Sequence, residues 1–254
     1  MITLSLIGIG SGDPRQLTQQ AIDAIGELDI ALVLDKGSDS SDLRLLREEL
    51  LRRFGRSSLR VVRLPDPPRA ATGEYLARVA AWHEQRAERW EDVLREQLSP
   101  QQTAGILVWG DPAFYDSTIR IAQTIQQRGV VPLEVKVIPG ISSIQLLAAG
   151  HQIALNQLNG PIHITTGRRL RDEGLPEGVD EAVVMLDGRC SFLQIALPDS
   201  EIFWGACLGS ADEQLIHGRV AEVGERIREV RDRLRERKGW VMDIYLLRQK
   251  AQPC

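Results

Sequence analysis

Three short glycine-containing segments have residue types and positions suited to binding a small ligand. They are Gly8–Asp13, Trp109–Tyr115 and Pro139–Ser143, and each directly follows an apolar run that predicts a strand. Glycine lets the backbone turn sharply and approach a ligand closely, because no side chain stands in the way. Ligands of open parallel sheets lie beyond the carboxyl ends of the strands. We therefore expect the three turns to form one binding site.

The first turn is close to a phosphate-binding loop but departs from it at one position. The dinucleotide-binding pattern GxGxxG, begun at Gly8 and Gly10, requires glycine at position 13, where this chain has Asp13. A carboxylate there would repel the pyrophosphate that normally occupies the start of the helix. Asp13 followed by Pro14 is instead typical of a helix cap. The turn favours a ligand without a phosphate, although Asp35, after the second predicted strand, keeps a NAD-dependent oxidoreductase open.

The second and third turns offer hydrogen-bonding groups beside apolar surface. Asp111 could accept hydrogen bonds or face a positive charge, and Phe114 offers an apolar ring. An ordinary Asp-Pro turn would use the same residues. Ser142 or Ser143 is a natural cap for the apolar helix that follows, which leaves the other hydroxyl to face a ligand.

Alternating strand and helix patterns position these turns. The strands predicted in the first half are residues 2–9, 30–34, 59–64, 106–109 and 135–138, with amphipathic helices between them. This alternation predicts a largely parallel sheet covered by helices on both faces. After a linker-like segment at 156–161, a second alternating set of strands is predicted at 162–166, 182–186, 201–208 and 240–247. We therefore predict an α/β protein with two α/β domains, residues 1–150 and 151–254.

One predicted helix is longer than the others and has an apolar face. It extends from about residue 74 to residue 98, with Thr72 as a candidate N-cap. Trp82 and Trp90 fall close to one face, which is typical of a helix that packs in a core or against a second copy of the chain.

Composition and charge argue against several classes of protein. The 254 residues include 31 Lys+Arg against 35 Asp+Glu, and the net charge of −4 gives no overall attraction to nucleic acid or an anionic membrane. No apolar run approaches the roughly 20 residues that span a bilayer, and the first residues lack the features of a signal peptide. Three cysteines without a CxxC pair or metal-ligand spacing fit a reducing compartment. We expect a soluble cytoplasmic protein without a metal site.

The three turns, in this order and at these spacings, resemble the motifs of the tetrapyrrole methylase family. Residues 183–188 and 208–220 are similar to stretches of that family's C-terminal half, so the resemblance covers nearly the whole chain. It implies two α/β domains with a cleft between them and S-adenosyl-L-methionine bound in that cleft. Ser11 departs from the family pattern, which often has proline at this position.

The resemblance implies a C-methyltransferase of cobalamin biosynthesis that methylates C-1 of precorrin-5, releases acetate and forms S-adenosyl-L-homocysteine. It also implies which residues surround the methyl donor. These are Gly10, Ser11, Trp109, Gly110, Asp111, Phe114, Ser142, Ser143, Leu186 and Leu208. Family members commonly pair, which implies a homodimer.

The precorrin substrate carries carboxylates, which need cationic partners. The candidates are basic side chains at predicted strand ends or in loops, namely Arg15, Lys36, Arg168 and Arg189. Deacetylation needs a base or an activated water, and no spacing selects among the four histidines. The catalytic residue is therefore left unassigned.

Other functions stay open on the residues alone. A different precorrin or uroporphyrinogen methylase, or a diphthine synthase-like methyltransferase, would use the same donor with another acceptor. A NAD-dependent oxidoreductase would bind the dinucleotide instead of the methyl donor. A non-catalytic corrinoid-binding protein would hold a tetrapyrrole without consuming any donor.

Overall fold

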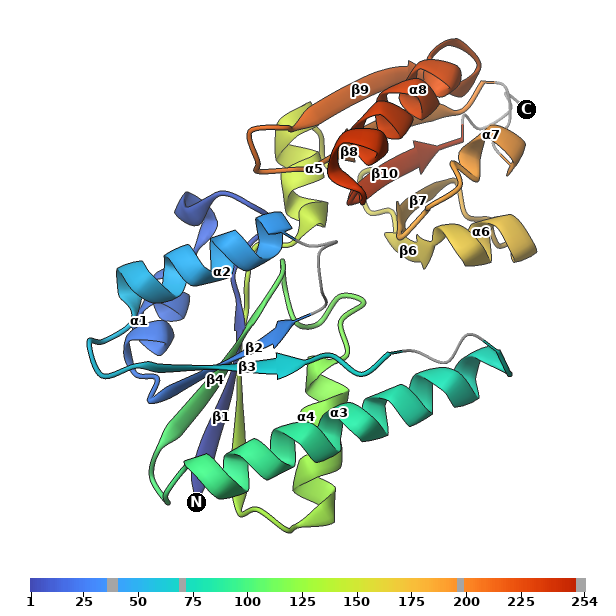
Figure 1. The fold of residues 1–254 in the computed structure, drawn as a ribbon. Coiled ribbons are helices and arrows are strands. Elements are labelled where there is room, and N and C mark those ends of the chain that lie inside the picture. Colours follow the sequence, from blue (N-terminus) through green and yellow to red (C-terminus); the bar gives the residue numbers. More distant parts are fainter. Residues whose placement is uncertain (36–40, 69–71, 196–198, 250–254) are drawn as a thin grey trace. The chain divides into compact units, whose positions relative to one another are not determined.

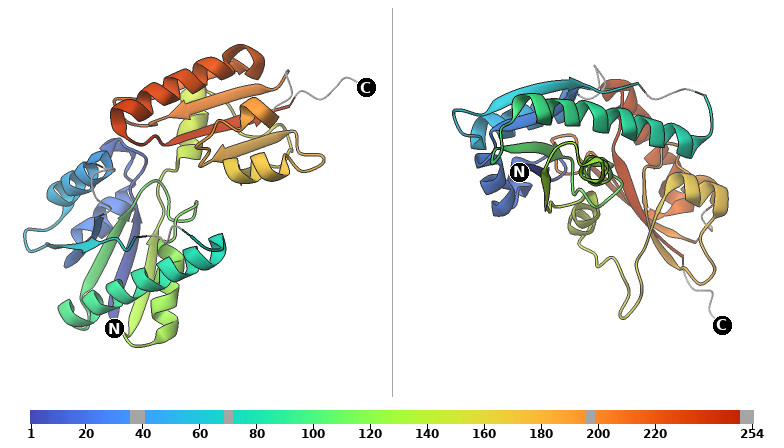
Figure 2. Two further views of the ribbon diagram at one scale, coloured as in Figure 1. Left: turned by 45° about the vertical axis from the view of Figure 1, so that its right-hand side comes forward. Right: turned by 90° about the horizontal axis from the view of Figure 1, so that it is seen from below.

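The computed structural model describes residues 1–35, 41–68, 72–195 and 199–249, which form two compact units (Figures 1 and 2). The first unit is residues 1–142 and the second is residues 143–254. The sequence pattern places the boundary eight residues later, after residue 150. The difference is helix α5 (Ser143–His151), which packs on strands of the second unit and so belongs to it.

The first unit is built on a five-stranded parallel sheet, as the alternating pattern predicts. Its strands are β1 (Ile2–Gly8), β2 (Ile30–Asp35), β3 (Arg60–Pro65), β4 (Thr103–Val108) and β5 (Leu133–Ile138). The strand order is β3-β2-β4-β1-β5, and every neighbouring pair is parallel. All carboxyl ends therefore lie at one edge of the sheet, where β1 and β4 finish side by side with Gly8 opposite Val108.

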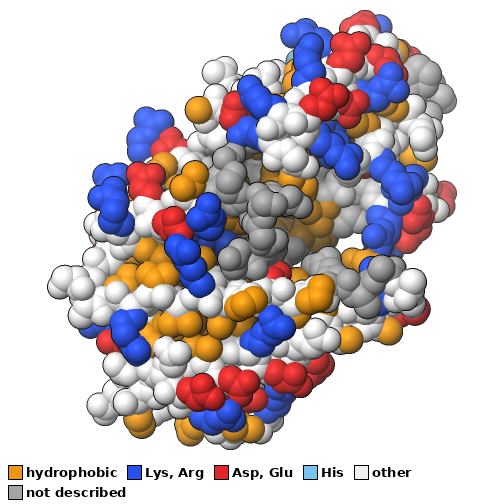
Figure 3. Space-filling view, viewed as in Figure 1, with side chains coloured by type: hydrophobic (Ala, Val, Ile, Leu, Met, Phe, Trp, Pro, Cys, Tyr) orange, Lys and Arg blue, Asp and Glu red, His pale blue; other side chains and the backbone are white. Residues whose placement is uncertain are grey.

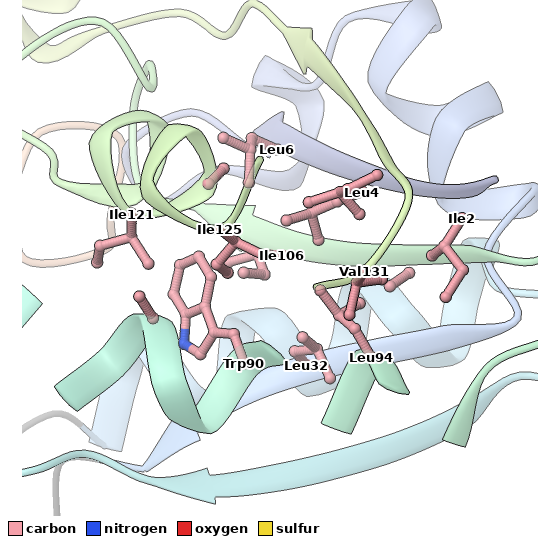
Figure 4. Packing of buried hydrophobic residues seen from close by; sticks show 14 of the residues in the cluster. Ile2, Leu4, Leu6, Leu32, Trp90, Leu94, Ile106, Ile121, Ile125 and Val131 are labelled. Atoms are coloured by element: carbon pink, nitrogen blue, oxygen red, sulfur yellow. The ribbon is translucent and has the colours of Figure 1, made fainter. Parts of the chain in front are cut away.

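Helices cover both faces of this sheet (Figure 1). On one face, α1 (Gln19–Gly26) and α2 (Ser41–Phe54) enclose a core with apolar residues of β1, β2 and β4. On the other face, α3 (Tyr75–Gln97) and α4 (Thr118–Arg128) enclose a second core around the fully buried Trp90. Figure 4 shows that indole among side chains from α4 and the strands, including Ile121, Ile106 and Leu32.

Helix α3 has the predicted length but a different N-cap. The Glu74 carboxylate accepts hydrogen bonds from the backbone N–H groups of Leu76 and Ala77, at 3.0 and 2.7 Å. These bonds lower the pKa of Glu74. The prediction of Thr72 as the cap was wrong, because a capping side chain must stand directly before the first helical residue to reach those N–H groups.

The outer face of α3 explains why this long segment is amphipathic. Acidic side chains recur every fourth residue and form a row along the helix (Figure 3). They are at least half exposed and pair with Arg95 or Arg128; the four are Glu84, Glu88, Asp92 and Glu96. Polar residues on this face and tryptophans on the other give the helix its single buried side.

The second unit contains a mixed sheet. Its strands are β6 (His163–Thr166), β7 (Glu181–Met185), β8 (Glu201–Ala206), β9 (Gln214–Arg219) and β10 (Asp243–Arg248). The order is β6-β7-β10-β8-β9, in which only β6 and β7 are parallel neighbours. The sequence pattern predicts each of these strands except β9, which forms a hairpin with β8 and needs no intervening helix.

Helices also lie on both faces of the second sheet. Residues of α6 (Gly167–Glu173), α7 (Phe192–Ile195) and α8 (Val220–Lys238) share a core with Trp204 of β8. Leu147 of α5 lies against Gly205, the next residue of β8. Successive strand residues point to opposite faces, so α5 covers the face opposite α8. Across the described ranges, none of the helices is both long and apolar enough to cross a membrane.

Candidate functional site

The turns after β1 and β4 are joined directly by their backbones. The N–H of Gly110 donates to the carbonyl of Gly10 at 2.8 Å, and the N–H of Gly10 donates to the carbonyl of Gly110 at 3.3 Å. This antiparallel bridge continues past the end of the parallel sheet. The structure thus brings two of the three predicted turns together.

These two turns lie where the chain connections diverge. After β1 the chain continues into the 3-10 turn Pro14–Gln16 and α1, on one face of the sheet. After β4 it continues into α4, on the opposite face. Ligands of doubly wound sheets bind at such a switch point. The location therefore agrees with the expected place for a binding site.

The third turn packs against the other two so closely that side chains are excluded. A Cβ atom on Gly140 would lie 2.2 Å from the carbonyl oxygen of Gly110. A Cβ atom on Gly8 would lie 2.6 Å from the amide nitrogen of Gly140. Both contacts are between backbone atoms, which cannot rotate away. The three predicted turns form one interlocked edge because glycine occupies these positions.

Asp111 ties the second turn to the third. Its Oδ1 atom accepts a hydrogen bond from the backbone N–H of Ala113 at 2.8 Å, and its Oδ2 atom accepts one from Gly140 at 2.9 Å. Each carboxylate oxygen has a second lone pair. The side chain therefore has a structural task in addition to any contact with a cationic ligand.

Two serines border the space next to Gly110. This glycine has a φ of +67°, and a Cβ atom on it would lie 3.7 Å from Ser11 Oγ and 3.8 Å from Ser142 Cα. Ser11 is only 3% exposed, and its Oγ has no hydrogen-bond partner within the described residues. Buried hydroxyls nearly always have a partner. An unsatisfied hydroxyl beside Gly110 indicates a position at which a ligand or a water would complete the site.

The first turn is held in shape by Gln16. Its side-chain oxygen accepts a hydrogen bond from the backbone N–H of Ser11 at 3.2 Å. A Cβ atom on Gly10, which has a φ of +75°, would lie 2.9 Å from the Cβ of Gln16. Glycine at position 10 is therefore required both by the backbone conformation and by the close side chain.

Asp13 caps the 3-10 turn, as its position before Pro14 predicts. Its carboxylate accepts the backbone N–H of Arg15 at 2.8 Å and pairs with the guanidinium of the same residue at 2.6 Å. The hydrogen bonds from Arg15 lower the pKa of Asp13. The Arg15 side chain is 90% exposed and already pairs with this carboxylate. A negative group at this position opposes a phosphate in the first turn.

The remaining predicted site residues, expected beside the same turns, have different surroundings from one another. Trp109 packs on the core beneath α1 and α2, and Phe114 is partly buried with its N–H bonded to the carbonyl of Asp111. Ser143 is the first residue of α5 and belongs to the second unit. Lys36 lies outside the described residues, as does the side chain of Asp35.

In the second unit, Leu186 and Leu208 follow β7 and β8 at one edge of the sheet. These strands share a direction, because each is antiparallel to β10. Leu186 is 58% exposed and has a φ of +56°, which is uncommon for a leucine. Leu208 is 4% exposed and lies over Gly205. Of the two predicted donor contacts, only Leu186 presents its side chain at the surface of its own unit.

The two predicted cations of the second unit are exposed at the same edge. Arg168 stands in the first turn of α6, directly after β6. Arg189 lies in the loop after β7, where its backbone N–H donates to the Asp187 carboxylate at 3.2 Å. Both therefore follow strands that run parallel to each other.

A buried network that the sequence analysis did not identify holds the loop carrying Leu186. Asp187 is 3% exposed, and its carboxylate accepts hydrogen bonds from the Ser191 N–H at 2.6 Å, the Ser191 hydroxyl at 2.9 Å and the Tyr245 hydroxyl at 2.8 Å. Burial, with the nearby Asp187 charge, raises the pKa of Tyr245 well above its usual value. A Cβ atom on Gly167 would lie 2.3 Å from the Cβ of Asp187. The loop conformation thus depends on side chains far apart in the sequence.

No group of His, Cys, Asp and Glu side chains in the described part of the chain is arranged to hold a metal ion. Two histidines of the second unit, His151 and His217, both contact the ring of Phe203, and their own ring centroids are 6.4 Å apart. Burial lowers the pKa of His151, whose Nε2 lies 3.0 Å from the carbonyl oxygen of Trp204. The interlocked turns supply backbone groups, hydroxyls and the carboxylates of Asp13 and Asp111, a set suited to orienting a ligand rather than to strong acid–base chemistry.

Comparison with known proteins agrees with this geometry. The family model of the Tetrapyrrole (Corrin/Porphyrin) Methylases matches residues 3–224. A Sinorhizobium sp. protein named precorrin-6A synthase [deacetylating] is 45% identical over 99% of this chain and 97% of its own length. The likeness therefore extends through both units and is not confined to the glycine turns.

Solved structures share this fold. A cobalamin synthesis related protein (CobF) from Corynebacterium diphtheriae has 35% sequence identity and a TM-score of 0.85, covering 99% of this chain and all of that one. A uroporphyrin-III C-methyltransferase from Thermus thermophilus, solved with S-adenosylhomocysteine, has 20% identity and a TM-score of 0.57, covering 96% of each chain. At that identity, the second likeness concerns the fold alone.

Proposed function

This chain belongs to the tetrapyrrole (corrin/porphyrin) methylase family, and from that premise we propose that it is a methyltransferase that acts on a precorrin. It takes the methyl group from S-adenosyl-L-methionine and transfers it to a ring carbon in cobalamin biosynthesis. Specifically, it methylates C-1 of precorrin-5 and releases acetate to give precorrin-6A. The observation that carries this proposal is the 45% identity, over nearly the full length of both chains, to a precorrin-6A synthase.

The residues of the first unit fit the methyl donor. The donor is a sulfonium cation without a phosphate, and the first turn has the Asp13 carboxylate where a dinucleotide would need glycine. Gly110 lies beside the Ser11 hydroxyl, which has no partner in the described residues. A donor bound there would bring its polar atoms close to Ser11 Oγ and give this hydroxyl a hydrogen-bond partner.

The chemistry needs alignment more than it needs a strong base. Bound S-adenosyl-L-methionine supplies an activated methyl group, and its sulfur leaves as a neutral thioether while the new C–C bond forms. The protein must hold sulfur, methyl and ring carbon in line, and such positioning can supply much of the rate enhancement. Interlocked turns such as Gly8–Ser11 and Gly110–Asp111 suit this task, because their backbone atoms have little freedom to move.

Release of the acetyl group as acetate is a hydrolytic step and needs one water. Arg15, Lys36, Arg168 and Arg189 remain the proposed partners of substrate carboxylates. The base for the hydrolysis stays unassigned, because no spacing in the sequence selects among the four histidines.

Calorimetric titration with S-adenosylhomocysteine, with NAD as the control, tests the donor site first. We expect stoichiometric binding of the former at low micromolar concentration or tighter, and none of the latter. Binding of NAD alone would overturn the proposal in favour of an oxidoreductase.

Incubation with donor and precorrin-5 then tests the acceptor. We expect one acetate for each S-adenosylhomocysteine formed. Methylation of precorrin-2 or uroporphyrinogen, without acetate, would identify a different methylase of this family. Methylation of a protein acceptor would identify a diphthine synthase-like enzyme, and tetrapyrrole binding without donor consumption would identify a corrinoid-binding protein.

We also propose that the protein is a cytoplasmic homodimer that binds neither nucleic acid nor membrane. The sparse, odd set of cysteines fits a reducing compartment, and the net charge of −4 gives no overall attraction to polyanions. Sedimentation of the purified chain would report its oligomeric state, and a monomer at assay concentration would contradict the dimer.

A further inference from the structure

Arg47 of α2 occupies a gap between two strands of the first sheet. Strands β2 and β4 pair only at their beginnings, where Ile30 and Ala31 lie opposite Ala104 and Gly105. Beyond that point β2 pairs with β3 alone. The Nε atom of Arg47 donates to the carbonyl of Leu107 on β4 at 3.0 Å. The arginine thus enters the opening that the diverging strands leave.

The position of Leu107 places this arginine beside the candidate site. The next carbonyl along β4, that of Val108, accepts a hydrogen bond from Ile9 on the β1 side. Successive carbonyls of a strand point to opposite sides, so the Leu107 carbonyl points toward β2. Two residues later the chain enters the turn that begins at Trp109. Arg47 therefore borders the interlocked turns on their β2 side.

The guanidinium of Arg47 is partly buried and has no direct counter-charge among the described residues. Within the residues that the structure describes, no carboxylate lies within ion-pair distance of it, and Nε is its sole bonded nitrogen. Burial lowers its pKa to about 10, and the more distant Asp116 charge opposes this effect. It nevertheless remains a cation at neutral pH.

The neighbouring charges are already engaged with other groups. Arg86 of α3 forms a buried ion pair with Asp66, at 2.5 to 2.6 Å, and stacks on the Trp82 ring. Asp116 accepts the backbone N–H of Thr118 at 2.7 Å. A cation withdrawn from water is normally paired with an acid, and the nearby Asp116 forms no ion pair with Arg47. The guanidinium therefore has donors that no described residue of the chain occupies.

We propose that Arg47 binds a carboxylate of the tetrapyrrole acceptor, as a substrate-binding residue beside the donor site. The inference rests on the proposed function for the identity of the acceptor. A guanidinium can bind a carboxylate through two parallel N–H···O bonds, which fixes its position as well as its charge. With the donor over the turns after β1, β4 and β5, this contact anchors the macrocycle on the β2 side of the same edge.

A purely structural role makes a different prediction. If Arg47 served only the Leu107 carbonyl, glutamine could replace it as a neutral donor without affecting ligand binding. The test therefore compares Arg47→Gln with Arg47→Lys. Lysine retains the positive charge but lacks the two parallel N–H groups of the guanidinium. Arg44→Gln is the matched control, because Arg44 lies on the same helix, is about half exposed and pairs with Glu48 at 3.7 Å.

The first measurement is a titration with uroporphyrin, a stable macrocycle with several carboxylates. Quenching of the uroporphyrin fluorescence reports binding. We expect Arg47→Gln to raise the Kd about 10- to 100-fold, the range for loss of a charge-assisted hydrogen bond. Arg47→Lys should have an intermediate Kd, and Arg44→Gln should equal wild type. Failure of the wild type to bind, or equal binding by Arg47→Gln, would overturn the inference.

The second measurement separates this inference from the proposed function. Titration of each folded variant with S-adenosylhomocysteine should give the wild-type Kd within about twofold, because Arg47 contacts the acceptor only. In turnover with precorrin-5, Arg47→Gln should raise KM far more than it changes kcat. If the wild type binds uroporphyrin through Arg47 but does not bind S-adenosylhomocysteine, the proposed function fails and the carboxylate site stands. If donor affinity falls as much as acceptor affinity, the assignment of Arg47 to the acceptor is wrong.

Discussion

In the first unit the turns at the carboxyl edge are held by backbone hydrogen bonds and by contacts that only glycine permits, as between Gly140 and Gly110. In the second unit the loop after β7 is held by a buried carboxylate, Asp187, and its side-chain partners. One edge is therefore shaped by the absence of side chains and the other by their presence.

This difference sets how each edge responds to substitution. Backbone atoms in contact cannot move aside, so the first edge has no tolerance for an added carbon. In the second unit, the loop after β7 holds two non-glycine residues, Leu186 and Cys190, at positive φ. Such conformations persist only where the surroundings impose them, and here the Asp187 network does so. Each hydrogen bond removed from that network should lower the free energy of unfolding by a further amount.

The largest expected effect comes from adding one methyl group to the first edge, at Gly140, and the matched control adds one to the second edge, at Gly188. Gly140→Ala would put a Cβ atom 2.2 Å from the Gly110 carbonyl oxygen, whereas a Cβ atom on Gly188 would meet nothing within 4 Å. We expect Gly140→Ala to lower the free energy of unfolding by at least about 3 kcal/mol and to abolish S-adenosylhomocysteine binding. Gly188→Ala should change neither. Thermal unfolding and calorimetry measure both, and a stable Gly140→Ala protein that still binds would refute the interlocked turns.

The next effect tests the side-chain network. Asp187→Ala leaves the Tyr245 hydroxyl and the Ser191 N–H buried without an acceptor, whereas the Ser191 hydroxyl keeps the Gly167 carbonyl at 3.1 Å; the change should cost about 2–4 kcal/mol. Tyr245→Phe removes a single donor and should cost about 1 kcal/mol. Urea unfolding of both variants measures the difference. Equal costs would mean that the carboxylate is not the centre of the network.

Asp111 lies between these two cases, because its side chain holds a backbone turn. Asp111→Ala removes the acceptor for the Ala113 and Gly140 N–H groups and should cost about 1–3 kcal/mol. Asp111→Asn keeps one acceptor oxygen and should cost less. Donor affinity, measured by calorimetry, should fall in the same order. Unchanged stability and affinity in Asp111→Ala would remove this residue from both roles.

The smallest effect concerns pH and the second unit alone. Burial lowers the pKa of His151 in the folded chain, whereas the unfolded value is about 6.5. As the pH falls below about 6.5, the unfolded chain binds a proton that the folded chain resists, so the free energy of unfolding decreases. His151→Gln should reduce this decrease between pH 7 and pH 5 by less than about 1 kcal/mol. An identical pH dependence in the variant would show that another group is responsible.

The first edge could be predicted from the sequence because its signals are local. Gly10, Gly110 and Gly140 each follow an apolar strand, and a parallel sheet must bring such turns to one edge. The predicted α/β class, the parallel first sheet and the family resemblance are confirmed. The hairpin strand β9 was missed, because its partly exposed, mixed residues lack a clear apolar run.

The second edge and the acceptor residue could not be predicted in this way. Asp187 and Tyr245 are 58 residues apart, and nothing in the local sequence of either indicates the other. Arg47 stands on a helix rich in arginine, a pattern that is typical of a solvent-exposed face. Its contact with the Leu107 carbonyl depends on the divergence of β2 from β4, which the three-dimensional arrangement reveals.

The place of β10 in the second sheet has a consequence for synthesis on the ribosome. This strand lies between β7 and β8, although it is the last of the five along the chain. The first unit uses only residues 1–142 and can fold while the rest is being translated. The second sheet, in contrast, has an open centre until residues 243–248 have left the exit tunnel. During synthesis there is therefore a stage in which the first unit, with its glycine turns, has folded while the second sheet still lacks its central strand.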